Sequence, residues 1–128
     1  MNFTLSKNER LHSKKSIKEL FDKGSSFFLY PFKVLYLDCP PEAIETNQVL
    51  FSVSKRKIKK AVDRNHVKRR IKEAYRLNKH LLTEKNKSKK NIAFIYVSSD
   101  ISTFKSVEPI IQKILKKLDN LPVKANQI

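Results

Sequence analysis

The side chains with the clearest chemistry lie in one basic segment. Between Lys55 and Lys79 the sequence holds twelve Lys and Arg residues but only two acidic ones, Asp63 and Glu73. Ammonium and guanidinium groups bind phosphate oxygens through charge-assisted hydrogen bonds, and a guanidinium can do so with two parallel donors. The chemistry indicated is recognition of a polyanion rather than cleavage of a bond.

The periodicity of this segment predicts a helix from about residue 61 to residue 82. At roughly 100° per residue, four side chains share the face that must contact a core: Val67, Ile71, Ala74 and Tyr75. Five side chains lie on the flank of that face and are called the basic stripe: Asn65, Lys68, Arg69, Lys72 and Arg76. His66, Arg70 and Glu73 fall on the far side, where we expect them to matter less or to contact something else.

Asn65 is the informative member of the stripe. A solvated face would favour Lys or Glu, whereas an amide holds donors and acceptors at fixed positions. We therefore interpret the stripe as a phosphate-binding surface with a specified contact. A merely solvated basic helix is the alternative.

Side chains suited to bond-breaking chemistry are sparse. The three histidines, His12, His66 and His80, form no evident constellation with a lysine, and no carboxylate cluster suits two metal ions. We predict no catalytic residue and no metal ligand. Cys39, the one cysteine, is expected to be a free thiol near a turn.

The whole chain shares the positive charge of the segment. Its 128 residues carry 28 Lys and Arg against 12 Asp and Glu, which gives a formal charge of +16 and a pI near 10.1. Such an excess repels itself and favours a polyanionic partner, either nucleic acid or an anionic membrane surface. The length indicates one domain over residues 1–128, with an ordered core at about 10–118 and short flexible tails. Neither a membrane-spanning stretch nor a signal peptide is evident, so we expect a cytoplasmic protein.

Local patterns predict the elements that position the basic helix. A short helix over residues 13–22 can be capped by Ser13 or Ser16 and ended by Gly24. A β region over residues 26–38 is broken by Pro31, and strands follow at 48–54 and 91–97. The last helix is predicted over residues 107–118, with Pro109 in its first turn. Alternation in the β region predicts one half-buried face made of Phe28, Tyr30, Phe32, Val34 and Tyr36.

Residues 52–76, SVSKRKIKKAVDRNHVKRRIKEAYR, resemble the protein subunit of bacterial ribonuclease P. The shared pattern is a strand ending in Ser-Val-Ser-Lys, a basic loop and an Arg-Asn-x-x-Lys-Arg helix. Upstream, residues 10–27 are similar to the first helix and following turn of that family. The resemblance covers about residues 10–118.

The resemblance implies an α+β fold with element order α-β-β-β-α-β-α. This is a two-layer sandwich of the ribosomal protein S5 domain 2-like type, whose parallel strands, here 48–54 and 92–97, are joined by a left-handed crossover. Connections of this kind are otherwise almost always right-handed. Pattern reasoning alone would therefore predict the opposite hand.

The resemblance also implies an accessory role in the removal of the 5′ leader from precursor tRNA. A large RNA subunit with bound Mg²⁺ performs the cleavage in that family, so the protein alone is expected to bind no cofactor. The implied partners are ribonuclease P RNA and precursor tRNA, with no membrane and no obligate protein partner.

The family's sites can be carried over to matching positions of this chain. The implied RNA-binding residues are Lys55, Lys57, Arg64, Asn65, His66, Lys68, Arg69, Lys72 and Arg76. A cleft between the first helix, the sheet and the second helix is implied to hold the single-stranded leader, lined by Ile17, Phe21, Lys33, Leu35 and Ser52.

Two positions depart from the family pattern. His66 stands at the third place of what is usually Arg-Asn-Arg, but it can still donate to a phosphate. Ile17 stands where the first helix commonly has an aromatic, which leaves Phe21 to stack on unpaired bases. Each such stack is worth roughly 1–3 kcal/mol. The cleft is therefore expected to use more charge and less stacking.

Two other kinds of protein fit the basic composition. A ribosomal-type RNA-binding protein with no role in tRNA processing would share the charge and the helix. A helix-turn-helix DNA-binding protein would need a short partner helix and a tight turn before the basic helix, where this sequence has a strand.

Overall fold

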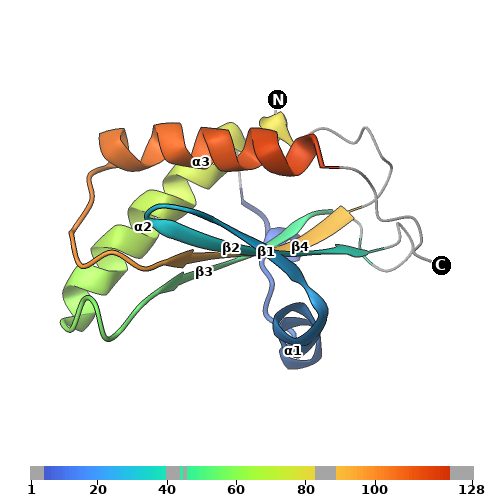
Figure 1. Ribbon diagram of the computed structural model, residues 1–128, viewed down its shortest axis with the longest axis horizontal. Coiled ribbons are helices and arrows are strands. Elements are labelled where there is room, and N and C mark those ends of the chain that lie inside the picture. The colour runs from blue at the N-terminus through green and yellow to red at the C-terminus, as the bar shows by residue number, and fades with distance from the viewer. Residues whose placement is uncertain (1–4, 40–43, 45, 83–88, 122–128) are drawn as a thin grey trace.

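The computed structural model describes residues 5–39, 44, 46–82 and 89–121. The elements follow the predicted order α-β-β-β-α-β-α (Figure 1). They are α1 (Lys14–Lys23), β1 (Ser25–Leu29), β2 (Phe32–Cys39), β3 (Gln48–Val53), α2 (Ala61–Asn78), β4 (Lys89–Tyr96) and α3 (Phe104–Asp119). Short 3-10 turns, η1 (Lys7–Glu9) and η2 (Lys79–Leu81), precede α1 and follow α2.

The described strands form a sheet in the order β1-β2-β4-β3. β2 pairs antiparallel with both β1 and β4, whereas β3 and β4 are parallel and are joined through α2. Helices α2 and α3 cover one face of the sheet, and α1 packs on the other (Figure 1). The predicted α+β class is confirmed.

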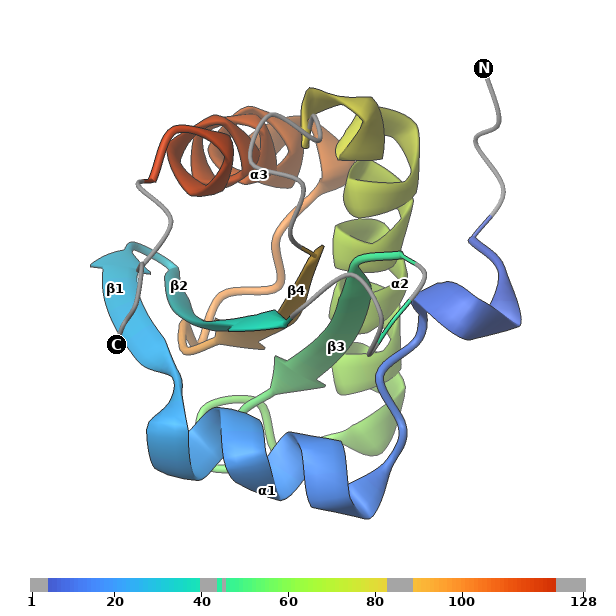
Figure 2. The ribbon, with the colours of Figure 1, turned by 90° about the vertical axis from the view of Figure 1, so that its right-hand side faces the viewer.

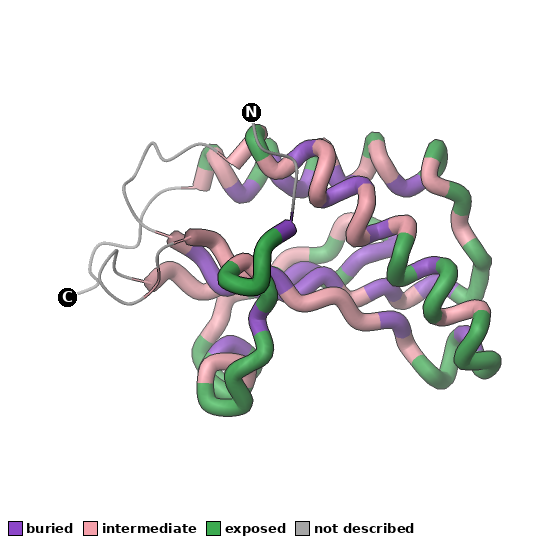
Figure 3. The backbone as a smooth tube through the Cα atoms, turned by 180° about the vertical axis from the view of Figure 1, so that it is seen from behind, coloured by how far each residue is buried: buried purple, intermediate pink, exposed green. Residues whose placement is uncertain are grey.

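The main core lies between the sheet and the α2–α3 layer. Buried side chains from β2 and β4, such as Phe32, Phe94 and Tyr96, meet Ile71 and Tyr75 of α2. Figure 3 shows the buried residues on the inner sides of α2 and α3, with exposed residues outside. A smaller cluster of Leu11, Leu20, Leu35 and Ala93 lies under α1.

The N-terminal segment before α1 is packed against the rest of the protein. Leu5 is buried in the main core, and Glu9 pairs with Lys79 after α2 at 2.7 Å. The described fold therefore extends N-terminal of residue 10. The predicted flexible tails include residues 1–4 and 122–128, which lie outside the described residues.

Helix α1 begins at a side-chain cap and ends at a glycine. The Ser13 hydroxyl accepts a hydrogen bond from the Ser16 backbone N–H at 3.3 Å, so Ser13 is the cap. Gly24 ends the helix in extended backbone, with φ at −70°. A Cβ at Gly24 would lie 2.4 Å from the Leu20 carbonyl oxygen and 3.0 Å from that of Tyr36. Close approach to the last turn of α1 and to β2, rather than a left-handed turn, therefore explains this glycine.

The predicted single face of alternating aromatics is wrong. The chain reverses at a cis Tyr30–Pro31 bond, and the β1–β2 hairpin aligns Phe28 with Lys33 and Phe27 with Val34. Phe27 therefore faces the α3 layer, where the Lys117 ammonium lies 4.7 Å from its ring centroid. Phe28 points to the opposite face and is 59% exposed. A turn between two strands resets the alternation that one continuous strand would keep.

Two predicted boundaries also differ. α3 begins at Phe104, with the Thr103 hydroxyl accepting from the Ser106 N–H at 3.2 Å, so Pro109 lies in the second turn rather than the first. β4 begins at Lys89 because Lys90 is buried in the sheet and paired with Asp38 at 2.5 Å. A charged pair made across two strands is invisible to a hydrophobic pattern.

Candidate nucleic-acid interface

Helix α2 presents the basic stripe much as the helical arithmetic predicted. Val67, Ile71, Ala74 and Tyr75 are buried against the sheet. Among the stripe residues Asn65, Lys68 and Arg69 are exposed, whereas Lys72 and Arg76 are half-buried. His66 is exposed as well, beside the stripe. The N-terminal half of α2 thus offers its cations and one amide to solvent.

The basic loop between β3 and α2 is fixed in place by Arg64. The Arg64 Nη1 donates to the Ile58 carbonyl at 2.9 Å and to the Lys59 carbonyl at 2.8 Å. Ile58 is buried, and its N–H donates to the Ser54 carbonyl at 3.0 Å. Lys55 and Lys57 are exposed on this loop. Arg64, predicted to contact RNA, therefore also holds the loop that carries two other predicted contacts.

Arg76, at the far end of the stripe, has a partner within its own helix. Its guanidinium meets the Glu73 carboxylate twice, with Nε–Oε1 at 3.1 Å and Nη2–Oε2 at 2.6 Å. The hydrogen bond from Arg76 lowers the pKa of Glu73, and the same bond raises the pKa of Arg76. The i,i+3 spacing could have revealed this pair. Part of the Arg76 charge is therefore already neutralised.

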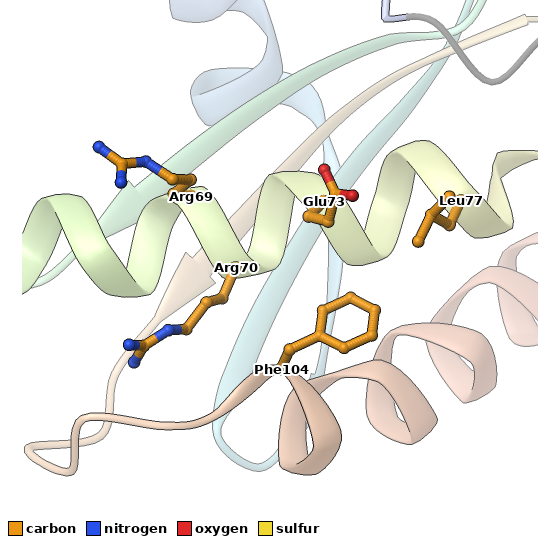
Figure 4. A pocket seen from close by; sticks show the side chains of 5 residues that line it. All are labelled: Arg69, Arg70, Glu73, Leu77 and Phe104. Carbon is orange, nitrogen blue, oxygen red and sulfur yellow. The ribbon is translucent and has the colours of Figure 1, made fainter.

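Arg70 contacts a different element, as its position on the far side predicted. Its Nη1 donates to the Ser102 carbonyl at 2.7 Å, which ties α2 to the segment before α3. A pocket of about 410 Å³ lies there, lined by Arg69, Arg70, Glu73, Leu77 and Phe104. Figure 4 shows that the Arg69 and Arg70 side chains leave α2 in different directions.

A second surface lies on the α1 side of the sheet. Cross-strand neighbours point to the same face, and the strand registers place Phe28 next to Lys33, Lys33 next to Ile95 and Ile95 next to Ser52. These four residues, one from each strand, are called the floor row. Phe28 and Lys33 are exposed, and Ile95 and Ser52 are half-buried. The predicted cleft residues Lys33 and Ser52 therefore share an accessible face.

The next row of the same face is closed by α1. Leu35 pairs with Ala93 in this row and is only 7% exposed beneath α1, while Ile17 packs against the same cluster. The side chain of Leu35, which was predicted to line the sheet side of the leader cleft, therefore supports α1. Phe21 stands outside the cluster and is 51% exposed.

The floor row runs alongside α1. The chain enters α1 next to β3, where the Leu11 N–H donates to the Val49 carbonyl at 2.8 Å, and it leaves through Gly24 into β1. Helix α1 therefore crosses the strands as the floor row does (Figure 2). A hollow of about 360 Å³ begins two residues beyond Ser52 in the chain. It is lined by Ser54, Arg56, Lys57 and Val97. The floor row thus connects β1 with the basic loop.

The described part of the chain has few other candidate groups. Within it, no three His, Cys, Asp or Glu side chains lie together as a metal site would require, and no helix has the length and apolar character to cross a membrane. Cys39 ends β2 as a free thiol, and burial raises its pKa.

Known proteins resemble this chain over nearly its whole length. The family model described as Ribonuclease P matches residues 5–119. The ribonuclease P protein component of Porphyromonas gingivalis W83 is 39% identical over 127 residues, which cover 96% of this chain and 93% of that protein. The corresponding protein of Clostridioides difficile 630 is 37% identical, over 93% of this chain and 97% of that protein. The structure of the Staphylococcus aureus RNase P protein aligns with a TM-score of 0.69 at 24% identity, covering 86% of this chain and 94% of that one, and so supports the fold.

Proposed function

The chain belongs to the ribonuclease P protein family, and from that premise we propose how it divides its two surfaces between two RNA partners. The protein is a ribonuclease P subunit and acts in tRNA processing. The family match decides against the ribosomal-type alternative. A strand and a basic loop precede α2 in place of the partner helix of a helix-turn-helix unit.

The basic stripe and the basic loop bind the RNA subunit of ribonuclease P in this proposal. Asn65, Lys68 and Arg69 offer a donor-rich exposed surface, and Arg64 presents Lys55 and Lys57 beside it. His66 and Lys72 flank these residues. Arg76 contributes the guanidinium N–H groups that are not hydrogen-bonded to Glu73. Phosphate groups of a folded RNA match such a surface because they are closely spaced anions.

The floor row and α1 bind the single-stranded 5′ leader of precursor tRNA. Lys33 supplies a cation and Ser52 a hydroxyl from the sheet, and Phe21 supplies an exposed ring from the wall that α1 forms. Ile17 forms the base of that wall, and Leu35 holds it from below. The observation that carries the proposal is that the floor row leads from the sheet into the basic hollow at Arg56 and Lys57. The leader and the RNA subunit therefore meet at the basic loop.

Cleavage is assigned to the RNA subunit and to Mg²⁺ that this RNA holds. The protein's part is to bind and orient, because its cations lower the repulsion between the leader and the RNA subunit. We place the assembled particle in the cytoplasm, where precursor tRNA is made.

Reconstitution tests the function as a whole. A bacterial ribonuclease P RNA and a precursor tRNA are combined at low Mg²⁺, with and without the protein, and the mature 5′ end is quantified. The protein is expected to accelerate maturation. A rate equal to that of RNA alone would contradict the proposal.

Two variants separate the surfaces. Lys68→Ala is expected to weaken binding to the RNA subunit while preserving the preference of the assembled enzyme for precursor over mature tRNA. Phe21→Ala is expected to reduce that preference while preserving assembly. If both variants lost the same property, the division between the surfaces would be wrong.

A further inference from the structure

The end of the floor row at β1 carries an exposed aromatic pair. Phe28 is 59% exposed and Tyr30 is 62% exposed, and their ring centroids are 6.2 Å apart at an angle of 53°. The Tyr30 hydroxyl donates to the Ser98 Oγ at 3.2 Å, and that oxygen also accepts from the Asp100 N–H at 3.0 Å. Tyr30 is therefore held in place by this hydrogen bond, and the Phe28 ring contacts an anchored ring.

The exposure of Phe28 is not a consequence of poor packing in the hairpin. The alternate residues Phe27 and Leu29 pack on the main core, and Phe27 also contacts Tyr36 with ring centroids 6.0 Å apart. Phe28 points the other way, next to Lys33 on the floor row. An aromatic ring beside a cation on an open strand is the combination that single-stranded nucleic acid uses, with bases stacking on the ring and phosphates on the cation.

We propose that Phe28 is a stacking site for an unpaired base of single-stranded RNA, and that it extends the leader surface across the sheet to its edge strand. The inference rests on the proposed function, in which the leader lies along the floor row. At about 4.8 Å between strands, the three steps from β3 to β1 span roughly 14 Å. At about 3.4 Å per stacked nucleotide that distance corresponds to roughly four nucleotides. Only leaders long enough to reach β1 can then use Phe28.

Leader length and the chemistry at position 28 test the proposal together. The assembled enzyme is given mature tRNA and precursors with leaders of about two and about eight nucleotides, lengths on either side of the roughly four-nucleotide span. Phe28→Ala and Phe28→Leu are expected to weaken binding of the long-leader precursor by about fivefold or more, as loss of one base stack does. Binding of the short-leader precursor and of mature tRNA is expected to stay unchanged. Phe28→Tyr, which keeps a ring, is expected to restore the wild-type affinity for the long leader.

Each other result overturns the inference. Unchanged affinity of Phe28→Ala for the long leader, or full affinity of Phe28→Leu, would show that no stack is made. Equal losses for both leader lengths would point to a general effect on the fold. If the wild-type enzyme itself bound precursor and mature tRNA equally, the proposed leader surface would fail first.

Discussion

Arg64 and Lys68 lie one turn apart on α2, but their charged groups have different surroundings. The Arg64 Nη1 donates hydrogen bonds to two loop carbonyls, and the residue is half-buried. Lys68 is exposed on the basic stripe. A change at Arg64 would therefore alter the basic loop as well as any RNA contact, whereas a change at Lys68 reports on the contact itself.

Lys68→Ala is the cleanest residue-scale test of the stripe. Loss of one phosphate contact is expected to reduce the slope of log affinity for the RNA subunit against log salt by about one unit or less. Titrations at several salt concentrations measure that slope. Lys113→Ala, at an exposed lysine of α3, is the matched control for removing one positive charge. Equal slopes for the two variants would mean that only total charge matters.

Arg70→Ala is less suitable as a control, although the helix angles place Arg70 off the basic stripe. The helical arithmetic correctly predicted that Arg70 leaves the stripe, but it could not identify the Ser102 carbonyl as its partner. Likewise, it predicted that Arg76 belongs to the stripe and gave no weight to Glu73. Angles around one helix predict the direction of a side chain, whereas its hydrogen bonds depend on loops and neighbours brought together by the fold.

Helix α1 is held at both of its ends, and this fixes the wall of the proposed leader surface. Leu11 is hydrogen-bonded to β3, Leu20 is buried beneath the middle of the helix, and Gly24 fits against β2. The sequence predicted the helix, Ser13 as one of two candidate caps, and the stop at Gly24. It did not predict that Leu35 would be covered, because the pairing of Leu35 with Ala93 joins strands far apart in the chain.

Gly24→Ala tests how tightly the end of α1 and strand β2 enclose position 24. The new methyl group would meet two carbonyl oxygens at 2.4 and 3.0 Å, so the backbone must shift. We expect a loss of about 1–3 kcal/mol in the free energy of unfolding, as for other overpacked sites, measured by urea denaturation. Ser26→Ala, on exposed β1 nearby, is the control. Wild-type stability of Gly24→Ala would show that the junction has room to spare.

The β1–β2 hairpin shows that strand patterns do not predict which face a residue takes after a turn. The breaking of the β region at Pro31 was predicted correctly, but the alternation was continued through the turn. The face of each residue after a turn depends on the register of the hairpin, which only the pairing of Phe28 with Lys33 reveals. That error placed Phe28 on the half-buried face of the sheet rather than on the open one.

At the scale of the whole molecule, the Glu9–Lys79 ion pair ties the N-terminal segment to the end of α2. Burial raises the pKa of Glu9, but hydrogen bonds from Lys79 and Ser6 outweigh it, so the pKa lies below its ordinary value of 4.5. A carboxyl group with a lowered pKa stabilises the fold above the unfolded-state pKa, and this stabilisation is lost as the pH falls through the folded-state value.

Glu9→Gln is expected to lower the free energy of unfolding by about 1 kcal/mol at pH 7, since a charge-assisted hydrogen bond is lost. The difference from wild type is expected to shrink as the pH falls below about 4.5. Urea denaturation at pH 7 and at acidic pH measures both values. A difference independent of pH would show that the carboxylate charge contributes nothing.

The charge of +16 predicts a second property of the whole molecule. Self-repulsion opposes compactness, so we expect partial unfolding at low salt without a ligand. Sulfate bound to the folded state adds stability that grows with its concentration, and circular dichroism is expected to show more helix in sulfate than in chloride of equal ionic strength. Equal spectra in the two salts would contradict a specific anion effect.

The sheet order β1-β2-β4-β3 has a consequence for synthesis on the ribosome. β4 is the last strand to be made, yet it lies between β2 and β3. At about 5–20 residues per second, the hairpin and β3 leave the exit tunnel seconds before the strand that joins them. Helix α2, with all its positive charge, emerges in that interval beside the RNA of the ribosome itself. The fold therefore closes late, after its most basic helix has already met a competing polyanion.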